Sequence, residues 1–379
     1  MRVYLDHNAS APLRAEAREA MREVLDAAGN PSSAHREGAR ARSMVERARA
    51  DVAALIGATP AEIVFTSGAT ESNNLALRGV TAVRPGALVT TVIEHASVLD
   101  TARVLGETKV PVVTVGVDPA GRVAVRDVVA ACPPATALVS VGLANGEVGS
   151  VAPVGQIAAV LAGRGILIHT DAAQAAGRIP VDVRDLGVDL ASLSAHKLGG
   201  PTGVGALWIR RGVVLQPMST GGPQERGKRA GTENVVGIAG FGAAARAARA
   251  ELNVSMDRLT TLRDRLWHGI HAALPDAVSN GPIDGLRLPN TVNLTIPGVA
   301  GESLLVLLDL AGIAASLGSA CAAGSPEPSH VLRAMGRSET DARSGLRLSL
   351  GSATTADEVD HVVRVLPELV AQIRAGRAA

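Results

Sequence analysis

The segment GILIHTDAAQAAGRIPVDVRDLGVDLASLSAHKLGGPTGVGALWI (165–209) carries the clearest evidence for the fold class of this chain. It contains short apolar runs at 165–170, 188–193 and 204–209, and these predict three strands. Strands with such continuous apolar character are typical of a mainly parallel sheet covered by helices on both faces. Ligands bind beyond the carboxyl ends of such strands, so the polar residues that follow them, Asp171 and Lys197, are candidate site residues.

The sequence before this stretch continues the same alternation of strands and helices. Four further apolar runs predict strands at 62–66, 87–92, 111–115 and 136–142. Helical spacing separates most of them, at 70–80, 97–105 and 153–162. Together these elements predict an α/β fold with a seven-stranded, mainly parallel sheet.

The two ends of the chain predict a second, smaller domain of the α+β class. Helical patterns at 14–27 and 35–56 belong to the first two-thirds of the chain, and a further helical pattern covers 234–273. After 273 come strands at 291–297 and 346–351, helices at 301–312 and 357–375, and a loop rich in Gly, Ser and Ala at 316–326. We expect a large domain over 13–249 and a small domain formed by 1–12 and 250–379, as suits a chain of 379 residues.

The composition argues against several classes of protein. Lys and Arg number 37 against 36 Asp and Glu, so the net charge of +1 predicts neither nucleic-acid nor anionic-membrane binding. The basic ERGKR cluster (225–229) fits a solvated loop. No apolar signal segment is present, and Pro133 and Pro134 interrupt the longest uncharged run, so we expect a soluble, cytoplasmic protein. Two cysteines, Cys132 and Cys321, and histidines without metal spacing predict no disulfide framework and no metal.

The loop SGATESNN (67–74), after the first predicted strand, could bind a phosphate. Ser67, Gly68 and Thr70 lead into a helix, where backbone amides and hydroxyls favour an anion. The alternative is an ordinary helix cap.

Asp171 and Lys197 follow predicted strands, and their side chains could pair with a ring nitrogen and form a Schiff base. A strand-end carboxylate needs a partner such as a protonated ring nitrogen, although it could instead cap the following segment. Lys197 lies among small residues, where desolvation lowers the pKa of an amine and favours Schiff-base chemistry. A phosphate cup, a carboxylate and a reactive lysine on one sheet edge predict pyridoxal 5′-phosphate (PLP) as cofactor. His95, after another strand, could stack on its ring or cap the helix from Ser97.

Ten motifs, in order from residue 4 to about 351, resemble the PLP-dependent cysteine desulfurases of the class V aminotransferase group. They are YLDHNASAP, GNPSSAHREG, FTSGATESNN, IEHASVLDT, ANGEVG, HTDAAQAAG, SAHKLGGPTGVG, QERGKRAGTEN, GSACAAGSPEPSHVLRAMG and LRLSLG. The resemblance implies PLP fold type I, like that of aspartate aminotransferase. It also implies a homodimer.

The resemblance gives roles to individual residues. Lys197 would form the Schiff base, Asp171 would pair with the pyridine nitrogen, Gln174 would bond the phenolic oxygen and His95 would stack on the ring. The phosphate would be held by Ala69, Thr70, Ser194 and His196, with Thr232 reaching the site of the neighbouring subunit. Arg347 and Asn30 would bind the substrate carboxylate, and Cys321 would be the nucleophile that receives sulfur from L-cysteine.

The implied reaction converts L-cysteine to L-alanine and leaves a persulfide on Cys321 for a sulfur-acceptor protein. The acceptor stays open: an iron–sulfur scaffold, a tRNA-thiolation protein, a DNA-modification system or a biosynthetic pathway. One departure is Gly146, where the family usually has a second asparagine after Asn145, so one contact to the cofactor is missing. The alternatives are a selenocysteine lyase or other class V enzyme, and a non-catalytic sulfur-carrier or scaffold subunit.

Overall fold

A computed structural model describes residues 2–25, 29–317 and 328–376. Its centre is a seven-stranded sheet in the order β2-β8-β7-β6-β5-β3-β4. The strands are β2 (Ile63–Thr66), β3 (Ala87–Thr91), β4 (Val112–Val115), β5 (Thr136–Ser140), β6 (Leu167–Asp171), β7 (Leu190–Ser194) and β8 (Gly205–Ile209). β8 runs antiparallel to both neighbours, and the other pairs are parallel, which confirms the mainly parallel sheet.

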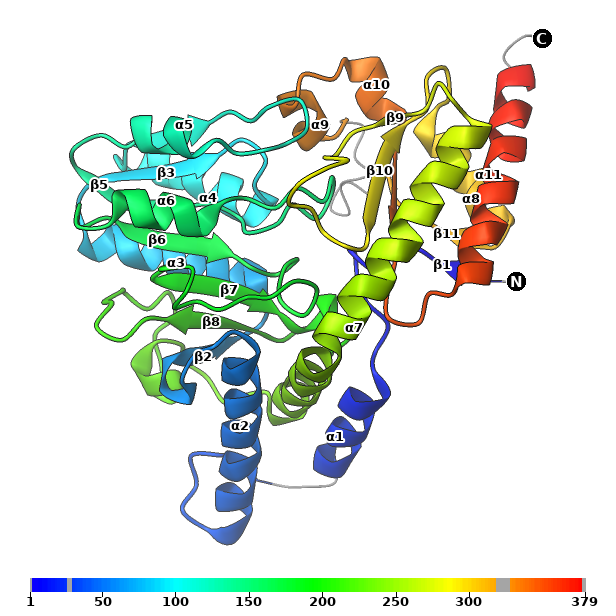
Figure 1. Cartoon of the computed structure of the whole chain (residues 1–379). Helices are drawn as coiled ribbons and strands as arrows, with labels where there is room; N and C mark the ends of the chain where they lie inside the picture. Colours follow the sequence, from blue (N-terminus) through cyan, green and yellow to red (C-terminus); the bar gives the residue numbers. More distant parts are fainter. Residues whose placement is uncertain (1, 26–28, 318–327, 377–379) are drawn as a thin grey trace.

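Helices cover both faces of this sheet (Figure 1). Leu88, Leu138 and Leu190 point to one face, where they pack with α3 (Ala69–Val83) and α4 (Ala96–Glu107). The residues next to them in each strand, such as Val89 and Val139, point to the other face. That face packs against α2 (Arg36–Leu55), α6 (Val154–Leu161) and the start of α7 (Val235–Ala273). Because side chains alternate along a strand, strands buried on both sides must be apolar throughout.

A second core lies beside the first and is built from both ends of the chain (Figure 1). It contains a three-stranded antiparallel sheet, β12-β10-β9, and a two-stranded parallel sheet, β1-β11. The helices α8 (Gly301–Leu310) and α11 (Ala356–Gly376) cover these strands. The strands are β1 (Val3–Tyr4), β9 (Val278–Ser279), β10 (Thr291–Thr295), β11 (Ile313–Ala314) and β12 (Gly345–Ser349).

The helix α7 belongs to both cores. Its residues up to Ala248 pack in the first core, and those from Leu259 onward pack in the second. The predicted helix at 234–273 is therefore confirmed as one continuous element. In the part of the chain that the structure describes, no helix is long and apolar enough to cross a membrane.

Several short elements escaped the sequence patterns. They are α5 (Val125–Ala130), α9 (His330–Ala334) and α10 (Glu339–Arg343), whereas α1 (Ala15–Leu25) corresponds to the helix expected at 14–27. The strands β1, β9 and β11 have two residues each. Elements of two to six residues are too short to show a period, so only their tertiary neighbours identify them.

Candidate active site

A cavity of about 650 Å³ lies at the carboxyl ends of the large sheet. Thr91, Asp171 and Ser194, the last residues of β3, β6 and β7, form part of its wall. Parallel strands place ligands at this edge. The cavity brings together most of the side chains proposed from the sequence, namely Ala69, Thr70, His95, Asp171, Gln174, Ser194, His196, Lys197 and Arg347.

Lys197 ends a short 3-10 helix (Ala195–Lys197) that follows β7 directly. Its Nζ donates hydrogen bonds to the carbonyl oxygens of Asn8, at 2.7 Å, and Ala9, at 2.8 Å. The segment 6–10 therefore crosses from the second core to the edge of the large sheet. Two carbonyl acceptors fix the position of the amine in the cavity wall.

Asp171 ends β6, as the sequence predicts, but no helix follows it. Its Oδ1 accepts a hydrogen bond from the backbone of Ala173 at 3.0 Å, which closes a local turn. Its Oδ2 accepts one from Asn73 Nδ2 at 2.7 Å. The carboxylate is thus held from two sides while it lines the cavity.

His95 is both the cap of α4 and part of the cavity wall. Its Nδ1 accepts a hydrogen bond from the backbone N–H of Ser97 at 3.1 Å. Capping and a contact with a cofactor ring were alternatives in the sequence. The structure makes them compatible, because capping uses only one ring nitrogen.

The loop before α3 offers backbone amides without a side-chain cap. Gly68 is the N-cap residue, and no side chain among the described residues bonds the first amides there, so the ordinary capping alternative does not apply. Ser67, Ala69 and Thr70 line the cavity beside it. Burial, with the charges of Lys197 and Arg178, lowers the pKa of the nearby His196 to about 4, so this imidazole is neutral at pH 7.

Gln174 occupies the space that Gly146 leaves. Its Nε2 donates to the carbonyl of Asn8 at 3.0 Å, and its Oε1 accepts from Arg178. A Cβ atom at position 146 would lie 2.5 Å from Gln174 Nε2. The glycine therefore fixes where Gln174 lies in this chain.

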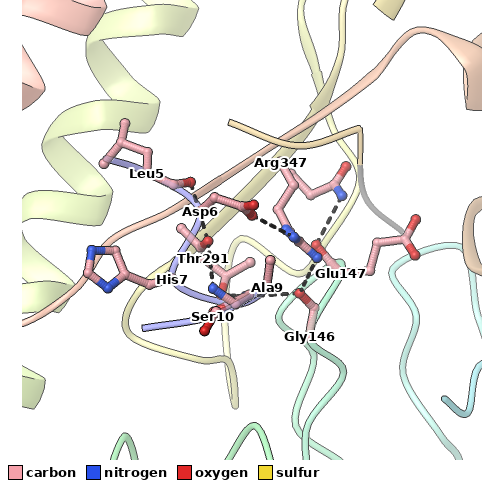
Figure 2. A network of polar contacts seen from close by, with 12 residues as sticks. Leu5, Asp6, His7, Ala9, Ser10, Gly146, Glu147, Thr291 and Arg347 are labelled. Carbon is pink, nitrogen blue, oxygen red and sulfur yellow. Dashed lines mark hydrogen bonds and ion pairs between the residues drawn. The ribbon is translucent and has the colours of Figure 1, made fainter. Parts of the chain in front are cut away.

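Arg347 lies in β12, is 3% exposed and reaches the cavity from the second core. Figure 2 shows its guanidinium between Asp6 and Gly146. Its Nη2 pairs with Asp6 Oδ1 at 2.8 Å, and its Nη1 donates to the Gly146 carbonyl at 3.3 Å. A buried guanidinium that is oriented in this way suits a carboxylate ligand.

Sequence reasoning missed two buried acids in the cavity wall, Glu94 and Glu147. Burial raises the pKa of each to about 7. Glu94 accepts from Thr91 Oγ1 at 2.6 Å, and Glu147 accepts from Ser329. They adjoin His95 and Gly146 in sequence, and this adjacency was the only available signal. Asp6 and Asn8 were also missed, although the motif YLDHNASAP contains them.

Two proposed residues do not line the cavity of this chain, and a third lies outside the part that the structure describes. Asn30 and Thr232 are exposed and do not line it, and Asn30 Oδ1 instead accepts from Ser32 at 2.9 Å. Cys321 lies outside the described residues. Their roles stay predictions. Cys132 is buried, with its thiol donating to Val128 O, which confirms its structural interpretation.

The residues present fit PLP. Uncapped amides at α3 suit a phosphate, the strand-end Asp171 suits a ring nitrogen, and Lys197 Nζ supplies the amine. Among the described residues, no group of three or more His, Cys, Asp or Glu side chains is arranged to hold a metal.

Comparisons with known proteins identify the family of this chain. "Cysteine desulfurase IscS" of Dictyoglomus turgidum is 42% identical over 98% of this chain and 95% of its own length. "Cysteine desulfurase" of Cereibacter sphaeroides is 46% identical over 99% of this chain and 97% of its own length. A solved structure titled "NIFS-LIKE PROTEIN" superposes with a TM-score of 0.91 at 37% identity, covering 98% of this chain and all of the other. The aminotransferase class-V profile matches residues 3–362, and the chain belongs to this family.

Proposed function

We propose that the protein is a PLP-dependent cysteine desulfurase that acts on L-cysteine. The observation that carries the proposal is the convergence of Lys197, Asp171 and Arg347 on one cavity at the strand ends. Relatives at 42% and 46% identity that carry the name cysteine desulfurase support it.

The residues of the chain have two kinds of role: some bind the cofactor and the substrate, and others transfer protons. When bound, PLP supplies an electron sink for a substrate carbanion. Lys197 Nζ would hold the cofactor and, once the amine of the substrate has displaced it, would take the proton from Cα, and Asp171 would stabilise a proton on the ring nitrogen. His95 and Gln174 would orient the ring. The phosphate would be held by Ala69, Thr70, Ser194 and the neutral His196. Arg347, with Asn30, would bind the substrate carboxylate.

Cys321 completes the reaction by accepting sulfur. Its thiolate attacks the sulfur of the substrate, so that an S–S bond forms and the bond between that sulfur and Cβ breaks. The electron pair stays with Cβ, which takes up a proton. Lys197 returns a proton to Cα, and the product leaves as L-alanine. The persulfide then passes to an acceptor protein. The IscS name of one relative favours iron–sulfur cluster biogenesis.

We further propose a cytoplasmic homodimer with two domains per chain. Thr232 is exposed and lies outside its own cavity, as a residue that contacts the partner's phosphate would. The separate hydrophobic cores support a large domain over 13–249 and a small one over 1–12 and 250–379. Sedimentation velocity of the purified protein tests the dimer, and a monomer that retains full activity would contradict it.

Reduction with borohydride tests the cofactor assignment. The chain has only three lysines, so mass spectrometry should find the pyridoxyl adduct on Lys197 and on neither Lys109 nor Lys228. Lys197→Ala should lose the adduct, and Lys109→Ala should retain it. An adduct elsewhere would refute the role of Lys197, and no adduct at all would favour a non-catalytic scaffold.

Persulfide trapping tests the reaction. Cys321→Ser should bind cysteine yet form no protein persulfide, whereas Cys132→Ser, at the buried thiol, should match the parent. Undiminished alanine and sulfide from Cys321→Ser would favour a plain lyase. A strong preference for selenocysteine over cysteine would favour a selenocysteine lyase.

A further inference from the structure

A buried chain of hydrogen bonds joins Asp171 to His95 through Asn73 and Ser97. We infer that Asn73 and Ser97 are positioning residues that fix the Asp171 carboxylate and hold His95 with its ring proton on Nε2. The inference rests on the proposed function, which gives Asp171 and His95 their roles. Neither Asn73 nor Ser97 lines the cavity, so both act through the residues that do.

The two residues come from neighbouring helices on the same face of the sheet. Asn73 lies in α3 and is 0% exposed, and Ser97 lies in the first turn of α4 and is 8% exposed. Asn73 Nδ2 is 2.7 Å from Asp171 Oδ2 and 2.9 Å from Ser97 Oγ. Ser97 Oγ is in turn 2.8 Å from His95 Nδ1. Two helices and β6 therefore meet in one unbroken series of polar contacts.

The direction of each hydrogen bond follows from the groups involved. Both oxygens of Asp171 accept, from Ala173 and from Asn73, so the amide nitrogen of Asn73 must face the carboxylate. The second hydrogen of this amide then points to Ser97 Oγ. The Ser97 hydroxyl, which accepts from Asn73, keeps its own hydrogen to donate to His95 Nδ1.

The backbone removes the remaining ambiguity at His95. The N–H of Ser97 also donates to Nδ1, at 3.1 Å, and an N–H group cannot accept. Nδ1 is thus an acceptor from two donors, so the proton of the neutral ring must be on Nε2.

The carbonyl oxygen of Asn73 indicates that the two N–H groups of this amide set its orientation. Asn73 Oδ1 is buried and has no hydrogen-bond partner among the described residues. A flipped amide would place this oxygen against the Asp171 carboxylate, which is unfavourable. Leaving a buried carbonyl unsatisfied is costly, and the amide keeps this arrangement because both of its N–H groups are used.

Nitrogen NMR of the holoenzyme with 15N-labelled histidine tests the tautomer directly. The parent should show His95 Nδ1 as an unprotonated nitrogen and Nε2 as a protonated one, with the signal assigned by its loss in His95→Gln. The double variant Asn73→Ala, Ser97→Ala keeps the backbone N–H at Nδ1 but loses the hydroxyl donor, so the Nδ1 signal should shift while the ring proton stays on Nε2. An unchanged Nδ1 signal would show that Ser97 Oγ does not donate to this nitrogen. A parent signal with the proton on Nδ1 would overturn the inference.

Kinetics of the same variants test the link to catalysis. Asn73→Ala should lower kcat roughly 10- to 100-fold, the range seen when a neighbour that orients a functional ligand is removed. KM for cysteine should hardly change, because Arg347 is untouched. Ser97→Ala should cost less, Ser97→Thr should retain the parent value, and the double variant should lose less than the product of the two single losses, because both single substitutions break the contact that the two residues share. Additive losses would refute the series.

Asn74 supplies the matched control. It also joins the two helices, because its Oδ1 accepts from Thr101 in α4 at 2.9 Å, but it contacts neither Asp171 nor His95. Asn74→Ala should therefore leave the His95 Nδ1 signal unchanged, and a shift there would indicate a general loosening of the helices. If the tautomer is as stated but borohydride gives no adduct on Lys197, the proposed function fails while the assignment of the hydrogen bonds stands.

Discussion

At the scale of single residues, Gly146 decides where Gln174 lies. A Cβ atom at position 146 would be 2.6 Å from Gln174 Cδ and 2.8 Å from its Cγ, so any side chain there must displace the glutamine. The displaced glutamine would lose its bonds to Asn8 and Arg178.

We expect Gly146→Ala to lower the free energy of unfolding by about 1–2 kcal/mol, the scale of one or two buried hydrogen bonds. In a Gln174→Ala background the same substitution should cost little, because the atoms it would strike are gone. Urea denaturation of the four proteins in this double-mutant cycle measures the coupling. Equal costs in both backgrounds would show that the two side chains do not compete for this space.

Glu94 makes the stability of the protein depend on pH. Burial is the first cause that raises its pKa from 4.5 to about 7, and the charge of Asp171 adds to it, while Thr91 and the Gly142 amide oppose the shift. The folded state therefore holds this proton more tightly than the unfolded state does. The stability contributed by Glu94 is highest below pH 4.5, falls as the pH rises to about 7, and stays low above it.

Glu94→Gln keeps an oxygen for Thr91 and Gly142 and removes the charge. We expect the variant to be more stable than the parent at pH 8, by on the order of 3 kcal/mol. This advantage should disappear near pH 4. Urea denaturation of the cofactor-free protein at pH 4, 6 and 8 measures the difference, with the exposed Glu302→Gln as control. A constant difference across these pH values would contradict the shifted pKa.

At the scale of elements, the C-terminal end of α4 contains a residue with a strained backbone conformation. Lys109 follows the capping residue Thr108 with φ 74°, in the left-handed region, and the amide of Val110 bonds the Leu105 carbonyl at 3.3 Å. This is the Schellman arrangement, in which glycine is preferred because a Cβ atom is strained there.

Lys109→Gly should therefore raise the free energy of unfolding by about 1 kcal/mol. Lys228 provides the contrast, because its backbone is right-handed, with φ −92° and ψ −23°. Lys228→Gly should lower stability by up to about 1 kcal/mol, since glycine there gains only freedom in the unfolded chain. Thermal unfolding of both variants is the measurement, and stabilisation by both would argue against a strained backbone at Lys109.

At the scale of the whole molecule, two tryptophans report on the two cores. Trp208 is buried in the first core, and Trp267 packs against the second, stacked on His271. The helix α7 runs without a break through both cores, so unfolding of one should disrupt the other (Figure 1).

We expect both cores to unfold in one transition. Leu266→Ala, in the second core, should lower stability by about 2–5 kcal/mol and shift the fluorescence midpoints of Trp208 and Trp267 together. Single-tryptophan variants, Trp208→Phe and Trp267→Phe, separate the two signals. Distinct midpoints would mean that α7 does not couple the cores.

Local sequence patterns were sufficient to predict the long helices and the ends of the strands in the central sheet. The predicted helix at 234–273 agrees with α7, and the seven predicted strands agree with those of the central sheet, to within about two residues. Burial of one or both faces of an element sets the spacing of its apolar residues, and this spacing is visible in the local sequence. The residues after those strands, such as Asp171 and Lys197, follow from the same rule, since parallel strands share one edge for their carboxyl ends.

Only the tertiary structure decided which residues hold these side chains in place. Asp6 and Arg347 are 341 residues apart in the chain, and Asn73 is 98 residues from Asp171. Nothing in a local pattern records such a pairing, because a hydrogen bond depends on the final positions of both partners. The buried acids Glu94 and Glu147 likewise acquire their raised pKa values only when the folded chain removes water from around them.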